Sequence, residues 1–322
     1  MQRPSVALRF LVAALALATV PESSLAQDVT AIRVGGIGYT DASSEPYYAQ
    51  SAGIFKKYGF DATMIGLGGG GAIVAAVVGG SLDVGFSNVV SAAQALERGI
   101  PIVVLAPAAV YVAPHADTLL VKARGSSLKT GADLNGKTVA VTTLGGSLQV
   151  CASAWIDKNG GDSKSVHFVE IGFSEMTAAL KQGRIDAAMV SEPALTRDKA
   201  DIEKLGDAFA AVGPRWALGV FVSSKTWVNA NPDAARRFVR AMVETARWAN
   251  GHRAETAKIL SAPSHIDLAT FAEMDRSEYG DALTAALLQP PIDAAVKYGA
   301  LKQPLDANQI VADSRPYWSG IK

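Results

Sequence analysis

The sequence is poor in cysteine and carries no excess of charge of either sign. Cys151 is the single cysteine, so the chain cannot form an internal disulfide bond, and a metal site built on several thiolates is excluded. The 30 basic and 30 acidic side chains give a formal net charge of zero. Proteins that bind nucleic acid usually show an excess or a patch of lysine and arginine, so we set that class of partner aside.

Residues that usually build catalytic or metal centres are also scarce. The four histidines, at positions 115, 167, 252 and 265, show no metal-ligand spacing. No G-x-S-x-G motif precedes a usable histidine and aspartate. Glu192 and Asp186 have no second carboxylate opposite them in the pattern, which favours capping or hydrogen-bonding roles. We therefore expect a protein that is not an enzyme, with no catalytic residues, no metal site and no cofactor.

Long apolar runs are absent, apart from one near the amino terminus. Residues 10–20 are apolar or small, follow a short segment with Arg3 and Arg9, and precede Ser24 and Ala26 at the positions that a signal peptidase inspects. The run is shorter than the ~20 residues of a membrane-spanning helix. We expect a cleavable signal peptide over residues 1–26, secretion to the periplasm without a lipid anchor, and a mature chain that is not membrane-embedded.

What the sequence does contain is an alternation of strand and helix patterns over its first two thirds. We expect strands over residues 31–35, 62–66, 83–87, 102–105, 137–141, 166–171 and 185–190, and helices over 43–55, 72–78, 147–158 and 176–181. Ser43 or Ser44 is expected to cap the first helix, with Pro46 in its first turn. Such alternation predicts a parallel α/β architecture.

The same unit occurs twice along the chain. Residues 80–86 and 183–189 both read glycine, a polar residue, an aliphatic residue, aspartate and then an apolar strand. Nearly the same number of residues separates each segment from the first strand of its unit. Chance similarity between two α/β segments is the alternative, but the matched spacing favours two tandem βαβαβ lobes.

The last third of the chain has a helical pattern instead. A helix begins near Asn231 and places Ala235, Phe238, Val239, Met242, Val243 and Ala246 on one face. Shorter helices are expected over residues 254–260, 268–279 and 293–298. We expect this C-terminal helical tail to cover the exposed face of one lobe.

Two glycine-rich loops follow strands, one in each lobe. Residues 66–71 match the dinucleotide fingerprint only because they are nearly all glycine, and Ala72-Ile73 replaces the Lys-Ser/Thr pair of a P-loop. Residues 142–147 form the second loop. Each loop is either a tight strand-to-helix turn or a place where backbone amides approach a ligand at a helix amino end. Their position at the carboxyl ends of strands in both lobes favours a shared site.

Four phrases resemble the substrate-binding proteins of ABC importers for sulfonates, nitrate and thiamine-precursor pyrimidines. They are "PYYAQSAGIFKKYGF" at residues 46–60, "GGSLDVG" at 79–85, "DLNGKTVA" at 133–140, and "GRIDAA" at 183–188 with Glu192-Pro193. The resemblance runs from about Ile32 to about Leu260. It is specific to the family and does not identify the ligand.

The resemblance implies an α/β, two-lobed periplasmic binding protein fold (type II), with the solute held between lobes joined by two crossover strands. Lobe 1 would comprise residues 27–108 plus 222–322, and lobe 2 residues 109–221, with crossovers near 105–119 and 216–223. Hinge closure would capture a small polar organic solute, and a membrane permease with its cytoplasmic ATPase would receive it. A monomer is expected.

Carried over by position, the resemblance also implies a set of ligand-binding residues in the loops that face the cleft. They are Tyr39, Ser43, Tyr47, Gly69, Gly70, Gly71, Ser87, Asn88, Thr142, Thr143, Gly145, Gly146, Ser147, Glu192 and Pro193, with Trp216 as a further aromatic wall. No lysine or arginine falls in these loops, which weakens the case for a strongly anionic ligand, although helix amino ends can bind anions without basic side chains.

Two other functions stay open at this point. A sensory or scavenging protein would present its solute to a receptor instead of an importer, and the sequence does not separate the two. A thiamine-pyrimidine biosynthesis enzyme would share the fold. Enzymes of that type are cytosolic and carry a cysteine-rich iron-binding run, whereas this chain has one cysteine and a secretion signal.

Overall fold

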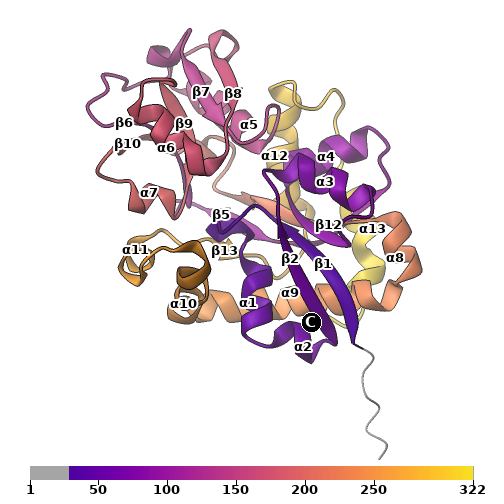
Figure 1. The fold of residues 1–322 in the computed structure, drawn as a ribbon. Helices are drawn as coiled ribbons and strands as arrows, with labels where there is room; N and C mark the ends of the chain where they lie inside the picture. The colour runs from indigo at the N-terminus through magenta and orange to yellow at the C-terminus, as the bar shows by residue number, and fades with distance from the viewer. Residues whose placement is uncertain (1–28, 322) are drawn as a thin grey trace, which may run out of the picture.

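The computed structural model describes residues 29–321, so the expected signal peptide over residues 1–26 lies outside the described residues. Two five-stranded sheets form the centres of two lobes, and a three-stranded sheet lies where the chain passes between them (Figure 1). Lobe 1 denotes the part around the sheet that contains β1, and lobe 2 the part around the sheet that contains β7.

Lobe 1 has the strand order β2-β1-β3-β12-β4. The strands are β1 (Thr30–Gly36), β2 (Phe60–Gly66), β3 (Val84–Asn88), β4 (Ile102–Pro107) and β12 (Gly219–Ser224). Strand β1 pairs in parallel with β2 and β3, while β12 runs antiparallel to β3 and β4. Its helices are α1 (Glu45–Ser51), α2 (Ile54–Lys57), α3 (Gly70–Val78) and α4 (Val89–Glu97).

Lobe 2 has the strand order β10-β6-β9-β7-β8. The strands are β6 (Thr118–Ala123), β7 (Thr138–Val141), β8 (His167–Glu170), β9 (Ala187–Ser191) and β10 (Ile202–Gly206). Strand β7 pairs in parallel with β8 and β9, and β6 runs antiparallel to β9 and β10. Its helices are α5 (Ser147–Lys158), α6 (Phe173–Lys181) and α7 (Ala194–Arg197).

The order β2-β1-β3 in lobe 1 is repeated by β8-β7-β9 in lobe 2, which confirms the predicted pair of βαβαβ lobes. The two repeated aspartates also have the same backbone role. Asp83 accepts a hydrogen bond from the amide of Arg33 at 2.7 Å, and Asp186 accepts one from the amide of Thr138 at 2.9 Å. Each aspartate therefore fixes the start of its strand against the first strand of its own unit.

Two segments carry the chain between the lobes through the three-stranded sheet β11-β5-β13. Its strands are β5 (Ala109–Val112), β11 (Arg215–Ala217) and β13 (Glu278–Tyr279). The chain passes from β4 through β5 to β6, and later from β10 through β11 to β12. The expected lobe boundary between residues 221 and 222 falls inside β12, a strand that pairs with lobe 1 strands along its whole length.

The first expected helix is divided into α1 and α2. Gly53 has a φ of 72°, a left-handed conformation that glycine adopts without strain and that interrupts the helix. Ser44 occupies the N-cap position of α1, but its hydroxyl donates to the carbonyl of Thr40 at 2.6 Å and caps no helical amide. The serine cap predicted for this helix is therefore wrong in its hydrogen bonding.

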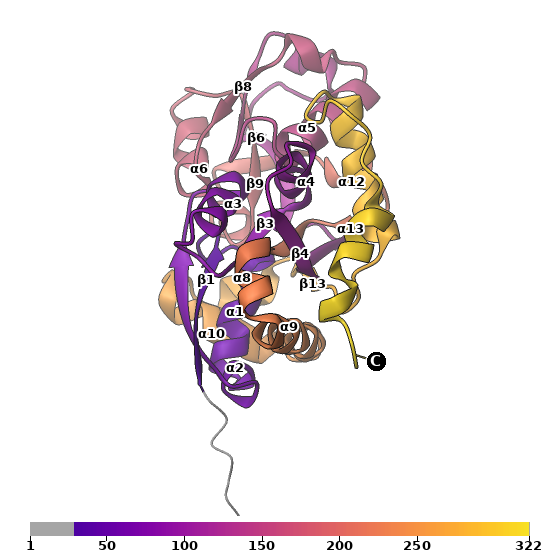
Figure 2. The ribbon, with the colours of Figure 1, turned by 90° about the vertical axis from the view of Figure 1, so that its right-hand side faces the viewer.

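The C-terminal tail consists of helices and touches both lobes. Its helices are α8 (Lys225–Ala230), α9 (Pro232–Gly251), α10 (Arg253–Ser264), α11 (Leu268–Glu273), α12 (Ala285–Lys297) and α13 (Ala307–Ser314). Helix α9 buries Phe238 and Val239 against the lobe 1 sheet. Helix α12 lies beside α4 and α5 (Figure 2), and Leu288 and Ile292 share a buried cluster with Val150 of α5. The expectation that the tail covers one lobe alone is therefore wrong, because α12 packs across the boundary between the two lobes.

Two helices of the tail differ from their predicted ranges. The helix expected over residues 268–279 ends at Glu273, and Glu278–Tyr279 form strand β13 because that segment pairs with β5. The helix expected over 293–298 begins eight residues earlier, at Ala285, where the side chain of Thr284 caps it. Its start was missed because Pro290 and Pro291, residues that normally disfavour a helix interior, lie inside it.

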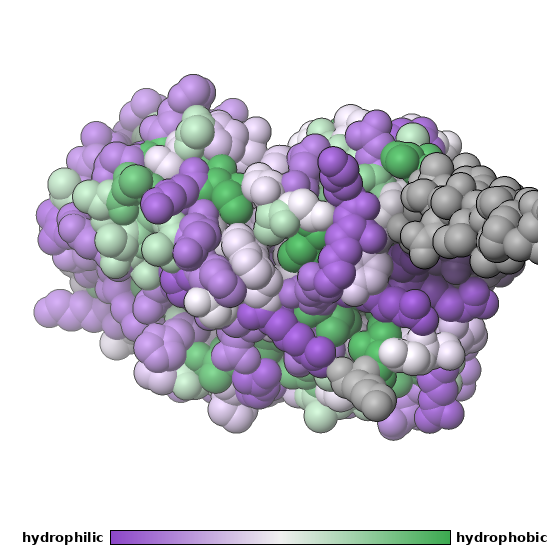
Figure 3. Space-filling model, turned by 90° about the horizontal axis from the view of Figure 1, so that it is seen from below, coloured by the Kyte–Doolittle hydropathy of each residue, from purple (hydrophilic) through white to green (hydrophobic). Residues whose placement is uncertain are grey.

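The face that Figure 3 shows is mostly hydrophilic, with hydrophobic residues scattered among charged and polar ones. Between residues 29 and 321, no helix is both long and apolar enough to cross a membrane. Cys151 is buried in lobe 2 as a free thiol.

Candidate ligand-binding cleft

A cavity lies between the lobes, where residues from both sheets and from the connecting sheet meet. Its volume is about 60 Å³, which is room for on the order of five water molecules. Lobe 1 supplies Ile37, Thr40, Ala42, Phe86 and Asn88; lobe 2 supplies Asp117, Thr118, Thr142, Thr143, Gly146, Ser147, Leu148, Phe173, Ser191 and Phe209; and the return connection supplies Trp216 and Leu218.

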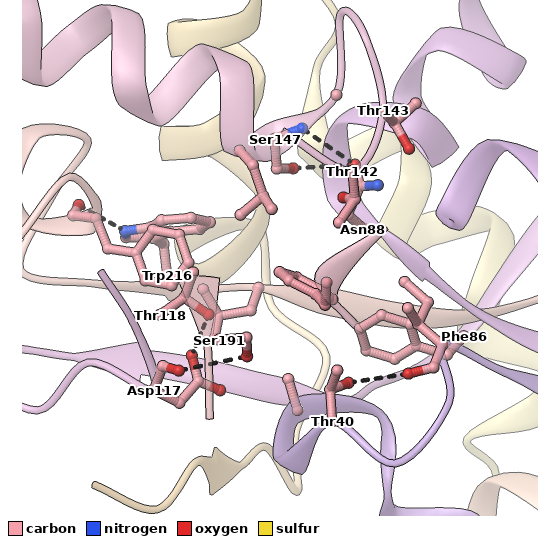
Figure 4. A pocket seen from close by; sticks show the side chains of 17 residues that line it. Thr40, Phe86, Asn88, Asp117, Thr118, Thr142, Thr143, Ser147, Ser191 and Trp216 are labelled. Carbon is pink, nitrogen blue, oxygen red and sulfur yellow. Dashed lines mark hydrogen bonds between the residues drawn. The ribbon is translucent and has the colours of Figure 1, made fainter. Parts of the chain in front are cut away.

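The parallel strands explain why these residues meet. Loops after β1, β3, β7, β8 and β9 all leave the carboxyl ends of their strands, and in open α/β sheets that edge is where ligands bind. Figure 4 shows Asn88 and Ser147 near one another on one side of the cavity, and Asp117, Thr118 and Ser191 together on another. The cavity is thus built from equivalent edges of the two lobes.

Asn88 joins the amino ends of α4 and α5 across the cleft. Its side-chain oxygen accepts hydrogen bonds from the amide of Ser91 at 2.9 Å and from the hydroxyl of Ser147 at 3.0 Å. The Ser147 amide approaches the same oxygen at 3.4 Å. A neutral amide oxygen therefore occupies the place where two helix amino ends would otherwise attract an anion.

Asp117 is a buried carboxylate in the cavity wall. Burial away from water raises its pKa to about 6, even though hydrogen bonds from Ser277 and Thr118 favour the charged form. Thr118 donates to one carboxylate oxygen at 3.0 Å, and the Ser277 hydroxyl donates to the other. Among the described residues, no ion pair involves Asp117.

A second, outer cavity adjoins the first and shares Ile37, Thr40, Phe173 and Ser191 with it. Glu192 and Pro193 line this outer space, as does the exposed Tyr39. Burial raises the pKa of Glu192 to about 7. Its carboxylate accepts hydrogen bonds from the amide of Thr196 at 3.0 Å and from the hydroxyl of Thr196 at 2.8 Å.

The floor beneath Asp117 is a buried ionic network that ties lobe 1 to the tail. Arg276 donates to Asp41 at 2.8 Å, and the amide of Ser277 donates to the other Asp41 oxygen at 2.6 Å. The hydroxyl of Tyr48 also donates to Asp41, at 3.1 Å. Ser277 thus connects the Asp41–Arg276 ion pair to Asp117.

The predicted ligand-binding residues fall into three groups. Six line the central cavity: Asn88, Thr142, Thr143, Gly146, Ser147 and Trp216. Three line the outer cavity: Tyr39, Glu192 and Pro193. The others line neither of these two cavities: Ser43, Tyr47, Gly69, Gly70, Gly71, Ser87 and Gly145. Ligand contact by any of them stays a prediction.

The glycines of residues 66–71 have a packing explanation that differs from ligand contact. A β-carbon at Gly69 would lie 2.6 Å from the Thr143 hydroxyl, on the other lobe. One at Gly70 would lie 2.9 Å from the backbone nitrogen of Asn88. Small residues here let α3 approach β3 and the facing loop closely. Ser87 likewise is buried and donates to the carbonyl of Gly70 at 3.3 Å.

Sequence reasoning missed several cavity residues, above all Asp117, Thr118, Ser191 and Phe173. Asp117 lies within the predicted crossover at 105–119, and a search of that segment for polar residues before the strand could have found it. Ser191 directly precedes Glu192 at the end of an expected strand. Phe173 gave no signal of its own, because an apolar residue at the start of a helix is common.

Two lobes with a cavity between their strand ends are the architecture of the periplasmic binding protein fold, and comparison with solved structures agrees. The periplasmic nitrate-binding protein NrtA from Synechocystis PCC 6803 superposes with a TM-score of 0.77 at 16% identity, over 91% of this chain and 89% of that one. The alkanesulfonate-binding protein SsuA from Xanthomonas axonopodis pv. citri, bound to MOPS, gives a TM-score of 0.71 at 20% identity, over 88% and 98% of the two chains. These likenesses confirm the predicted periplasmic binding protein fold.

The sequence profile described as "NMT1/THI5 like" matches residues 42–256, and the chain belongs to this family. A relative from Brucella abortus (strain 2308), provisionally named as a binding protein, is 26% identical over 313 residues, which cover 92% of this chain and 94% of the relative. The predicted family is therefore confirmed.

Proposed function

We propose that this protein is the solute-binding component of an ABC importer and acts in the periplasm. It captures a small polar organic solute between its lobes and delivers it to a membrane permease. The observation that carries the proposal is the cavity at the carboxyl ends of both sheets, to which lobe 1 contributes Asn88 and Thr40 and lobe 2 contributes Ser147 and Ser191. The membership of the family and the names of its structural neighbours support it.

Capture works by a shift between open and closed arrangements. A solute that touches both lobes binds the closed arrangement more tightly and so stabilises it. The two connecting segments, through β5 and β11, are where rotation of one lobe against the other is accommodated. Capture leaves the covalent bonds of the solute unchanged, and ATP hydrolysis by the ATPase on the far side of the membrane supplies the energy for transport.

Mass spectrometry and solution scattering test the proposal without assuming a ligand. The protein is purified from its host, denatured, and the released small molecules are identified. The refolded protein is then titrated with them while its radius of gyration is measured by X-ray scattering. We expect a solute that binds at one site per chain and lowers the radius of gyration. A protein that releases and binds no solute would contradict the proposal.

A further inference from the structure

The cleft has an unusual balance of charge for a solute-binding site. Asp117 in the central cavity and Glu192 in the outer one are 3% and 4% exposed, and both are carboxylates. The amide of Glu192 donates to the carbonyl of Asp117 at 2.7 Å, so the backbones of the two residues are adjacent, just beyond the paired ends of β6 and β9. Buried charges in proteins are normally compensated by an ion pair or a bound cation.

No basic side chain of the described residues compensates these two acids. Arg276 forms an ion pair with Asp41 at 2.8 Å, and Arg197 in the outer cavity wall forms one with Asp198 at 2.6 Å. Lysine and arginine are absent from the described lining of the central cavity. Thr118, Ser277 and Thr196 donate hydrogen bonds to the acids, but hydroxyls and amides carry no net charge.

Two of the helix amino ends at the cleft, those of α4 and α5, are already satisfied within the protein. The amino ends of α4 and α5 both point at the side-chain oxygen of Asn88, which accepts from Ser91 and Ser147. An anion at this place would have to displace that oxygen. These two helix ends therefore have few free hydrogen-bond donors for an anion, because Asn88 already accepts from them.

The remaining walls are aromatic. Phe86, Phe173, Phe209 and Trp216 line the central cavity, and Tyr39 lines the outer one beside Tyr47, with ring centroids 5.0 Å apart. The indole nitrogen of Trp216 donates to the carbonyl of Phe209 at 3.2 Å, so its hydrogen-bonding group is occupied within the protein. Aromatic faces beside a carboxylate attract organic cations, whose charge interacts with the ring quadrupole.

We propose that the solute carries an organic ammonium group, held by the carboxylates of Asp117 and Glu192 against these aromatic walls. The inference rests on the proposed function, because it concerns the ligand of the same cleft. The ammonium end fits where the two cavities meet, with Asp117 in the wall of the central cavity and Glu192 in the wall of the outer one. The outer cavity, of about 350 Å³, has room for the rest of the solute. The nitrate and sulfonate ligands named for the structural neighbours are of the opposite charge.

Thermal unfolding in the presence of matched probes tests the charge of the ligand. The cations are choline and butylammonium, and their neutral isosteres are 3,3-dimethylbutanol and 1-butanol. Nitrate, ethanesulfonate, KCl and CaCl₂ complete the panel. We expect a saturable rise of about 5 °C in melting temperature with at least one organic cation at ~100 times its dissociation constant, and no saturable rise with its isostere.

Two conservative variants locate the effect. Asp117→Asn and Glu192→Gln keep the size of each side chain and remove its charge, and each should weaken cation binding at least tenfold. Asp133→Asn, on an exposed loop of lobe 2, is the matched control and should bind as the parent does. If the Asp117→Asn variant fails to fold, the Glu192→Gln variant alone tests whether the cation binds at these acids.

The outcomes separate this inference from the proposed function. The ammonium inference would be overturned if the protein bound another probe saturably in place of the organic cations: nitrate, ethanesulfonate, an inorganic cation or a neutral isostere. The proposed solute-binding function would still stand in that case. Cation binding that survives both substitutions would overturn the assignment to this cleft. Binding of no probe, in a protein that also releases no solute on denaturation, would overturn both.

Discussion

The βαβαβ units of the two lobes share one scaffold but present different chemistry at the cleft. In both, an aspartate fixes the third strand against the first, through Asp83 in lobe 1 and Asp186 in lobe 2. At the strand ends, lobe 1 contributes mostly apolar side chains and the amide of Asn88. Lobe 2 contributes hydroxyls and the two unpaired acids. The scaffold is therefore duplicated while the loops that line the cavities are not, because packing constrains the strands more tightly than the loop tips.

The largest expected effect concerns the ion pair under the cleft, which has no counterpart in lobe 2. Asp41 is fully buried, and the side chain of Arg276 is 9% exposed. Arg276→Met should lower the free energy of unfolding by about 3 to 5 kcal/mol, because it leaves a buried carboxylate without its cation. Urea unfolding measures the loss. Lys225→Met, which removes an exposed partner of Asp313 at 4.0 Å, is the control and should change stability by less than about 1 kcal/mol.

The acids of lobe 2 should make stability fall as the pH rises. Asp117 has an ordinary pKa of 3.8 and a folded pKa of about 6, so the folded protein binds more protons between these values. Folding stability therefore decreases from about pH 4 to about pH 6, and the cost persists above that range, at roughly 1 to 3 kcal/mol. The groups around it are Asp41, Asp275, Ser277 and Thr118. Glu192 adds a second decrease that extends to about pH 7.

Asp117→Asn separates this effect from the other titrations. In unfolding experiments without added solute, the variant should be the more stable protein at pH 8 and equal to the parent near pH 4. A variant less stable than the parent at pH 8 would show that the charged carboxylate is well satisfied within the protein. That result would also weaken the case for a cationic ligand.

The two duplicated aspartates should contribute different amounts to the free energy of unfolding. Asp83 accepts from the backbone and from both Nε and Nη2 of Arg33, and its side chain is 10% exposed. Asp186 keeps its backbone bond but meets Lys137 only at 3.6 Å, with 37% of its side chain exposed. We expect Asp83→Asn to cost about 2 kcal/mol and Asp186→Asn about 1 kcal/mol or less in chemical unfolding. Equal losses would mean that burial does not distinguish the two copies.

Asn88 should matter for closure more than for stability. Asn88→Ala removes the cap of α4 and the bonds to Ser147, while Asp267→Ala removes only the cap of α11, which accepts from Thr270 at 2.8 Å. Each change should cost about 1 kcal/mol of stability. Only Asn88→Ala should raise the radius of gyration of the solute-bound protein. Equal radii of gyration for the two solute-bound variants would contradict a role of Asn88 in closure.

The smallest effect is expected at the glycines that face lobe 2. Gly69→Ala places a methyl group 2.6 Å from the Thr143 hydroxyl, whereas the nearest atom to a methyl at Gly71 lies 4.0 Å away. Gly69→Ala should weaken solute affinity about two- to fivefold by opposing closure, and Gly71→Ala should not. Isothermal titration with the identified solute measures both. A loss at Gly71 of the same size would favour direct ligand contact by this loop.

Local patterns in the sequence determined most of the fold. The strand patterns, the repeated Gly-polar-aliphatic-Asp segments and the family phrases were enough to predict two βαβαβ lobes with a cleft between them. They also placed Asn88, Thr142, Ser147 and Glu192 at strand ends that face the cleft. These features depend on neighbours along the chain, and hydrophobic periodicity reports on such neighbours directly.

Only the tertiary structure decided what the cleft contains. Ser277 lies 160 positions from Asp117, and Asn88 lies 59 from Ser147, yet hydrogen bonds join each pair. The tail meets both lobes through α12, and residues 278–279 form a strand only because β5 offers them an edge. Whether an acid is paired, or a helix end already satisfied, depends on which distant segments pack against it. That information is in the packing of the chain and not in any window of its sequence.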